Sequence, residues 1–410
     1  MIDNVCIGSS TQGVDVFTHA PPNSHQSVQG MSGSGKSTYL RLMENRFANE
    51  GAAVVSISCS GSHDIGENDL LPLGVKDRYA IHDVQKEGIP LSMWVQGDSP
   101  DNAARRLMSA FETCRQFGSK QMSLLYQGLL NACEHRPVAG DEMSSLLSEL
   151  KSDCKLAEVS AKLEYTYGFL QVIPQHGIFK PGMITELKVD TDYITNKSVV
   201  NFLLALLIFQ KKAILPDGEM VLVLDEYQNQ DLVHQDAPIP RLLKEGRKQN
   251  ISLLLATQTT SGFSRKEKAC INQAATKVYF RQTWEDAREI ARSWSSSSKQ
   301  QKKYEQDLTS LRVGRAIASG SFAVAGNRIQ SGLVYINNYR PKKSSTSSFP
   351  QSRKPAQEHL ADKQVSKHVV RPIYKADADS SAGTARINKA TALSNSAGLN
   401  NINEGRRTKP

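Results

Sequence analysis

Residues 30–37 read GMSGSGKS and match the pattern G-x-x-x-x-G-K-[ST] in full. They stand between SHQSVQ at 24–29, which predicts a strand, and TYLRLMENRFANE at 38–50, which predicts a helix. Glycines let successive backbone N–H groups converge on phosphate oxygens, and the N-terminal end of the following helix adds positive potential. Because the flanking strand and helix argue against a chance match in a flexible Gly/Ser turn, the stretch predicts a nucleotide phosphate loop.

The residues expected to bind the nucleotide belong to this loop and to the start of the helix. They are Gly30, Ser32, Gly33, Ser34, Gly35, Lys36, Ser37 and Thr38. In such loops the lysine reaches the β- and γ-phosphates and the hydroxyl residue after it binds Mg²⁺. The implied cofactors are therefore ATP and Mg²⁺.

A second motif, VLVLDE at 221–226, places two carboxylates directly after four apolar residues. A carboxylate at the C-terminal end of a buried strand lies where open α/β sheets bind ligands, so Asp225 is expected to hold Mg²⁺ together with Ser37. Glu226 is expected to polarise the attacking water. The alternative is an acidic pair that merely leaves a strand for solvent. The phosphate loop favours the catalytic interpretation.

The stretch EGRKQNISLLLATQ at 245–258 predicts a helix end, a core strand and then a polar residue, Gln258. If this strand lies beside the one that ends at Asp225, the amide of Gln258 can touch the γ-phosphate and the lytic water. Arg247 precedes the strand and is not expected to reach its own nucleotide. It would complete a neighbouring subunit's site as an arginine finger, or it would belong to a solvated helix end.

The composition and charge predict a soluble globular part followed by a basic C-terminal tail. The net charge is +9, and residues 341–410 hold 13 Lys or Arg against 5 Asp or Glu, so residues 1–340 are nearly neutral. The longest apolar run, VVNFLLALLIF at 199–209, is about half of the roughly 20 residues that a membrane span needs, so no span is expected. The six cysteines show neither zinc-ligand spacing nor a C-x-x-C pair, and together with the missing signal peptide they favour a cytoplasmic protein.

Strand and helix patterns alternate along most of the chain. A hairpin near Gly13 precedes the phosphate loop, and the apolar strands that follow are typical of a parallel sheet covered on both faces. A second hairpin is expected around Gly326. The division we expect has four parts: an N-terminal hairpin and phosphate-loop part at 1–98, an all-α insertion at 99–175, the second part of the core at 176–340, and a disordered basic tail at 341–410.

Taken in order, GMSGSGKS, VLVLDEYQ, EGRKQNISLLLATQ and INQAATKVYFRQTWED resemble the HerA/FtsK superfamily of P-loop motor ATPases. This group includes DNA translocases, packaging ATPases and type IV secretion ATPases. The resemblance spans about residues 5–336. It implies a RecA-like α/β fold, ATP hydrolysis, and a homo-hexamer with ATP between subunits. It also implies that Gln258 is the γ-phosphate sensor and that Arg247 acts in trans.

In the translocases of this group, the loop after the sensor strand lines the pore and touches DNA. The corresponding residues here are Arg265, Lys266 and Lys268, which would track a phosphate backbone without sequence preference or would only solvate an exposed loop. The second strand ends in SISCSGSHD in place of the acidic D-P turn of many relatives, so contacts at that strand end are expected to differ. Since the motor motifs begin close to residue 1, the N-terminal barrel of HerA proteins is not expected.

Three functions stay open. The first is a motor that moves DNA through a hexameric pore in conjugation, packaging or DNA processing. The second is an ATPase that energises a secretion or conjugation machine by moving protein, recruited to a membrane by its partner. The third is a ring scaffold whose ATP state regulates an effector such as a nuclease.

Overall fold

The computed structural model describes residues 4–58, 76–112, 117–135, 140–174, 177–189, 197–230, 232–233 and 237–338. The expected tail at 341–410 and most of the SISCSGSHD stretch lie outside these residues. In the described part, one sheet holds eleven strands in the order β11-β1-β2-β10-β9-β3-β8-β7-β4-β6-β5. The strands are β1 (Cys6–Ser10), β2 (Asp15–Thr18), β3 (Gln26–Gln29), β4 (Ala53–Ser58), β5 (Tyr79–Asp83), β6 (Ile184–Lys188), β7 (Met220–Leu224), β8 (Ile251–Thr257), β9 (Thr276–Tyr279), β10 (Arg315–Val324) and β11 (Asn327–Asn337).

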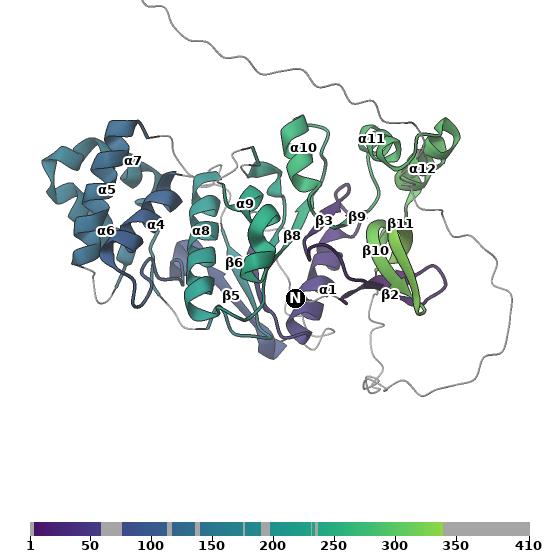
Figure 1. Ribbon diagram of the computed structural model, residues 1–410, viewed down its shortest axis with the longest axis horizontal. Helices are drawn as coiled ribbons and strands as arrows, with labels where there is room; N and C mark the ends of the chain where they lie inside the picture. The colour runs from purple at the N-terminus through teal and green to yellow at the C-terminus, as the bar shows by residue number, and fades with distance from the viewer. Residues whose placement is uncertain are drawn as a thin grey trace, which may run out of the picture. The chain divides into compact units, whose positions relative to one another are not determined.

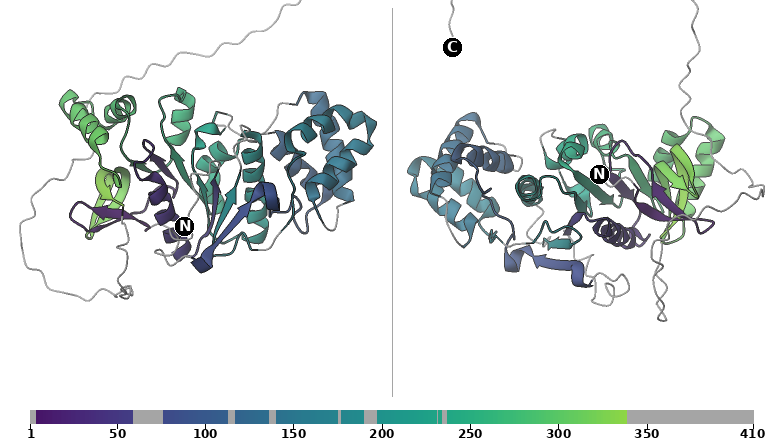
Figure 2. Two further views of the ribbon diagram at one scale, coloured as in Figure 1. Left: turned by 180° about the vertical axis from the view of Figure 1, so that it is seen from behind. Right: turned by 60° about the horizontal axis from the view of Figure 1, so that its bottom comes forward.

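The seven strands from β9 to β5 run parallel, as the sequence predicts. Alternate residues of each strand bury on opposite faces. Val221 and Val223 pack with α1 (Lys36–Asn49), whereas Leu222 and Leu224 pack in the core that contains α8 (Lys197–Ile214) and α9 (Pro238–Glu245). Helices therefore cover both faces of the sheet (Figures 1 and 2), which explains strands that are apolar almost end to end.

The order of the parallel strands matters for the site. β8 pairs with β7 on one side and with β3 on the other, all in parallel, so their carboxyl ends meet at one edge of the sheet. β7 and β8, the strands that precede Asp225 and Gln258, are therefore neighbours, which meets the condition set for contact between these two residues. The phosphate loop follows β3 at this same edge.

The described residues of the expected all-α insertion form four α-helices beside α8 (Figure 1): α4 (Pro100–Glu112), α5 (Ser119–Glu134), α6 (Glu142–Ser152) and α7 (Ala157–Tyr167). Aromatic rings join it to the core. The rings of Phe111 and Phe202 stack with centroids 5.1 Å apart, and the ring of Tyr167 lies 5.2 Å from that of Phe202. The apolar run of α8 is buried here. Among the described residues, no helix combines the length and apolar character needed to cross a membrane.

Both predicted hairpins are present and belong to one antiparallel extension of the sheet. β1 pairs with β2 and with β11, and β10 pairs with β2, β9 and β11. Ala325 and Gly326 turn β10 into β11 with φ values of 49° and 79°. The sequence did not predict the edge strand β5, nor α10 (Arg265–Ile271), α11 (Trp284–Trp294) and α12 (Ser298–Ser310).

A buried carboxylate in the insertion makes the stability depend on pH. Glu142 is 7% exposed and accepts hydrogen bonds from Ser92 Oγ (2.8 Å) and the Met93 N–H (2.5 Å). Burial raises its pKa from 4.5 to about 7. Because the folded pKa lies above the unfolded value, the stabilisation is complete below about pH 4.5 and is lost as the pH rises through about 7.

We therefore expect Glu142→Gln to resemble the wild type at pH 4.5 and to be more stable by about 3 kcal/mol at pH 8, since one pKa unit corresponds to about 1.4 kcal/mol. Denaturant unfolding of both proteins from pH 4.5 to 8 measures this difference, and other titrations cancel in it. A difference that does not change with pH would contradict the assignment.

Candidate active site

The phosphate loop needs its glycines for two reasons. At Gly30 an added Cβ would lie 2.6 Å from Cβ of Phe280, so no side chain fits. Gly33 and Gly35 have φ values of 70° and 107°, in the left-handed region that favours glycine. An added Cβ on Gly33 would have no atom within 4 Å, which leaves open space above the loop.

Hydrogen bonds from other segments fix the loop. The N–H of Gly30 donates to the Thr257 carbonyl at the end of β8 (3.2 Å), and the N–H of Met31 donates to the Arg281 carbonyl after β9 (2.8 Å). On the other side, the Gly314 N–H donates to the Ser34 carbonyl (2.9 Å). The Asn338 Nδ2 donates to the Gly35 carbonyl (3.0 Å). The sensor strand, β9 and the second hairpin therefore all hold the loop.

Lys36 begins α1 and is 7% exposed. Its Nζ donates to the Met31 carbonyl (3.2 Å) within the loop. Burial lowers the pKa of Lys36, and the charges of Asp225 and Glu226 act in the opposite direction. The lysine of the phosphate loop and the two carboxylates therefore lie close enough for their charges to interact.

The remaining loop residues fit a phosphate group. Ser32, Gly33, Ser37 and Thr38 are exposed at the loop and the first turn of α1. Ser34 is buried, and its Oγ donates to the Met31 carbonyl (2.6 Å), so this side chain supports the loop from inside. Free N–H groups at a helix N-terminus, a lysine, and the oxygens of Ser37 and Asp225 suit ATP with Mg²⁺.

Asp225 and Glu226 follow β7 directly. Asp225 is 8% exposed, and its Oδ1 accepts a hydrogen bond from the N–H of Glu226 (3.0 Å). Glu226 has φ 56° and ψ 45°, a left-handed conformation that non-glycine residues seldom adopt. Such strain clusters at functional sites, and here it turns the Glu226 side chain toward the next strand.

Gln258 follows β8, and its Nε2 donates to Oε1 of Glu226. The structure thus brings together Lys36, Asp225, Glu226 and Gln258 at the carboxyl edge of the sheet. The sequence did not reveal the support behind them. The Thr257 Oγ1 donates to Oε1 of Gln228 (2.8 Å), which joins the sensor strand to the turn after Glu226. Both residues belong to motifs quoted above, VLVLDEYQ and EGRKQNISLLLATQ, but neither pattern indicates this contact.

Arg247 lies at the other end of β8, in the 3₁₀ turn Gly246–Gln249. β8 has seven residues and at about 3.3 Å per residue spans roughly 23 Å. Arg247 is exposed and donates to the Pro22 carbonyl (3.2 Å). It does not join the nucleotide site of its own chain, and its role in a neighbour's site stays a prediction.

Part of the stretch expected as a pore loop is helical. Arg265, Lys266 and Lys268 belong to the helix α10, which begins after a capping box in which Ser264 and Glu267 bond each other's backbone N–H groups. The S-x-x-E spacing in the sequence was the signal for it. Arg265 and Lys266 are exposed, whereas Lys268 pairs with Glu289 of α11 (2.6 Å). Of the three cations, Arg265 and Lys266 are therefore exposed, and Lys268 forms an ion pair.

Comparison with solved structures identifies the fold. VirB4 of Thermoanaerobacter pseudethanolicus is similar over 83% of this chain and 97% of its own, with 17% sequence identity and a TM-score of 0.57. The bacterial conjugative coupling protein TrwBdeltaN70 is similar over 81% of this chain and 89% of its own, with 14% identity and a TM-score of 0.50. The chain has the fold of VirB4 and TrwB.

This likeness confirms the predicted fold class, a RecA-like α/β core around a mostly parallel sheet. No family model and no curated protein matches the sequence.

Proposed function

We propose that this protein is an ATPase of HerA/FtsK type that couples hydrolysis to movement of a substrate. The observation that carries the proposal is the contact between the amide of Gln258 and the carboxylate of Glu226, next to the buried Lys36. A phosphate-binding lysine, a catalytic base and a sensor amide thereby meet at one edge of the sheet.

Each residue has a separate task. Lys36 and the N–H groups of the loop bind the phosphates, and Ser37 and Asp225 hold Mg²⁺. When bound, ATP with Mg²⁺ supplies the phosphoanhydride bond that is cleaved. Glu226 orients water and accepts its proton.

Gln258 couples binding to activation. In the structure, Nε2 of Gln258 donates a hydrogen bond to Oε1 of Glu226. If Gln258 turns to the γ-phosphate, it leaves that oxygen free to accept a proton. The rearrangement makes the sensor strand responsive to the presence of the γ-phosphate.

Arg247 supports a ring, because it stands at the end of β8 that faces away from its own phosphate loop. We propose a homo-hexamer in which Arg247 enters the site of the next subunit. An arginine finger stabilises transition-state charge and contributes about 10³-fold or more to kcat.

The trans role predicts complementation. Arg247→Ala subunits and Glu226→Gln subunits should each be inactive, and a 1:1 mixture should recover roughly a quarter of the wild-type sites, since Glu226 and Arg247 then come from different subunits. ATPase assays of the mixture measure the recovery, with Lys248→Ala as the control for a neighbouring exposed cation. A mixture as inactive as its parents would contradict a shared site.

DNA is the substrate that we propose first, because Arg265 and Lys266 are exposed on α10 close to the sensor. Contacts to a phosphate backbone need only positive charge. The likeness to TrwB, a bacterial conjugative coupling protein, favours a role in conjugation or secretion. The second candidate is an ATPase that moves protein in such a machine.

Stimulation of ATP hydrolysis by DNA tests the substrate. The full-length protein should hydrolyse ATP several-fold faster with duplex or single-stranded DNA, and Arg265→Ala with Lys266→Ala should remove most of this effect and reduce its salt dependence. Lys302→Ala with Lys303→Ala, two exposed cations of α12, is the matched control. Hydrolysis that does not respond to DNA would favour a protein substrate or a scaffold.

A further inference from the structure

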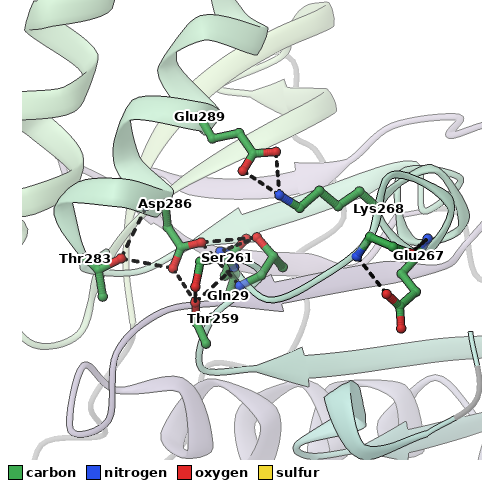
Figure 3. A network of polar contacts seen from close by, with 10 residues as sticks. Gln29, Thr259, Ser261, Glu267, Lys268, Thr283, Asp286 and Glu289 are labelled. Carbon is green, nitrogen blue, oxygen red and sulfur yellow. Dashed lines mark hydrogen bonds and ion pairs between the residues drawn. The ribbon is translucent and has the colours of Figure 1, made fainter.

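One buried carboxylate joins the turn after the sensor strand to α11. Asp286 lies in the first turn of α11 and is 1% exposed. Its Oδ2 accepts from Thr259 Oγ1 (2.7 Å) and Thr283 Oγ1 (3.0 Å), and its Oδ1 accepts from the N–H and Oγ1 of Thr260 (both 3.3 Å). Figure 3 shows the side chains of Thr259 and Thr283 pointing to that of Asp286.

The same network reaches the phosphate loop. Thr259 and Thr260 follow Gln258 directly, and Thr260 Oγ1 also accepts a hydrogen bond from Gln29 Nε2 (3.0 Å). Gln29 is the last residue of β3, immediately before Gly30. The exit of the sensor strand, the entry of the phosphate loop and α11 are therefore linked by side-chain hydrogen bonds.

One turn further along α11, Glu289 contacts α10. Its carboxylate contacts Lys268 Nζ at 2.6 and 2.8 Å (Figure 3). Asp286 and Glu289 are three residues apart and thus lie on one side of the helix. A pocket of about 420 Å³ is lined by Phe263, Arg265, Lys268, Ala269 and Asn272, in and beside α10, and by Glu289 of α11.

Capping of α11 does not require this arrangement. The hydroxyl of Thr283 already accepts the N–H of Asp286 (3.3 Å), which needs only the backbone of Asp286. The hydrogen-bond donors named above for the buried Asp286 carboxylate are all neutral. Two of the three residues that supply them, Thr259 and Thr260, belong to the turn after β8, here called the sensor turn. If Thr259 and Thr260 moved without α11, a buried charge would keep only its hydrogen bond from Thr283, and the loss of the others is more costly than the loss of a neutral contact.

We propose that Asp286 is a positioning residue that makes α11 follow the sensor turn, so that the nucleotide state at Gln258 is passed to α10 through the Glu289–Lys268 pair. This inference rests on the proposed function, since it assumes that Gln258 responds to the γ-phosphate.

The test compares Asp286→Asn with Glu285→Gln, which removes the same charge from the same turn at an exposed position. Amide hydrogen exchange of the full-length protein is measured with and without ATPγS and Mg²⁺. In the wild type and in Glu285→Gln, we expect ATPγS to change exchange both in the phosphate loop and first turn at 30–40 and in α11. In Asp286→Asn, the change at 30–40 should stay, and the change in α11 should fall to less than half.

A wild-type response confined to the phosphate loop, or an undiminished response of α11 in Asp286→Asn, would overturn the inference. No response at 30–40 in the wild type would instead refute the proposed nucleotide site, and the inference with it. If Asp286→Asn does not fold, Thr259→Val and Thr259→Ser replace it. The serine variant keeps the hydroxyl that bonds Asp286 and should retain the response of α11, and the valine variant should lose it.

Discussion

Lys36→Ala should weaken the binding of ATPγS on the order of 100-fold, because charge-assisted hydrogen bonds to two phosphates contribute about 3 kcal/mol. Titration calorimetry of the wild type and the variant measures the loss. Lys36 is buried, and burial lowers its pKa, so the lysine charge is itself costly in the free protein.

The free-energy cost of burying the Lys36 charge provides an internal control for folding. Removing Lys36 should leave the free energy of unfolding unchanged or slightly higher, which separates a binding defect from misfolding. Lys36→Arg keeps the charge but not the compact ammonium, and it should also bind poorly. Equal affinity of the wild type and Lys36→Ala would remove the basis for the nucleotide site.

Glu226→Gln should bind ATPγS like the wild type and lower kcat by about 10³-fold, since the amide cannot accept the proton of the attacking water. The substituted amide can still accept the hydrogen bond of Gln258, so the site should keep its shape. ATP turnover and ATPγS affinity, measured on the same preparation, give both values.

The matched control is Glu219→Gln, which replaces a carboxylate just before β7, at the end of that strand away from the phosphate loop. It should leave kcat unchanged. A Glu226→Gln protein with wild-type turnover would show that another group serves as the base.

The sequence predicts those parts of the site that local patterns encode. The phosphate loop is recognisable because its glycines and lysine have fixed spacing, and the positions of Asp225 and Gln258 follow from apolar strands that end in polar residues. Asp225 and Gln258 lie close together because β7 pairs in parallel with β8. The sequence did not decide this pairing, and the structure shows it.

Other features have no local signature. β5 is a half-exposed edge strand, and its residues YAIHD lack the apolar run of a central strand. The Asp286 network joins β3, the turn after β8 and α11, which are far apart in the sequence. α10 is different, because the S-x-x-E spacing of Ser264 and Glu267 is a local signature of its start, which the sequence analysis did not use.

The contact of Asn338 with the phosphate loop has a practical consequence for protein engineering. Asn338 follows β11 and is among the last described residues, yet its amide holds the carbonyl of Gly35 at the N-cap of α1. A shortened protein made for crystallisation should therefore end after residue 338. A cut only a few residues earlier would remove a support of the nucleotide site, and the resulting loss of ATP affinity would be mistaken for a function of the basic tail.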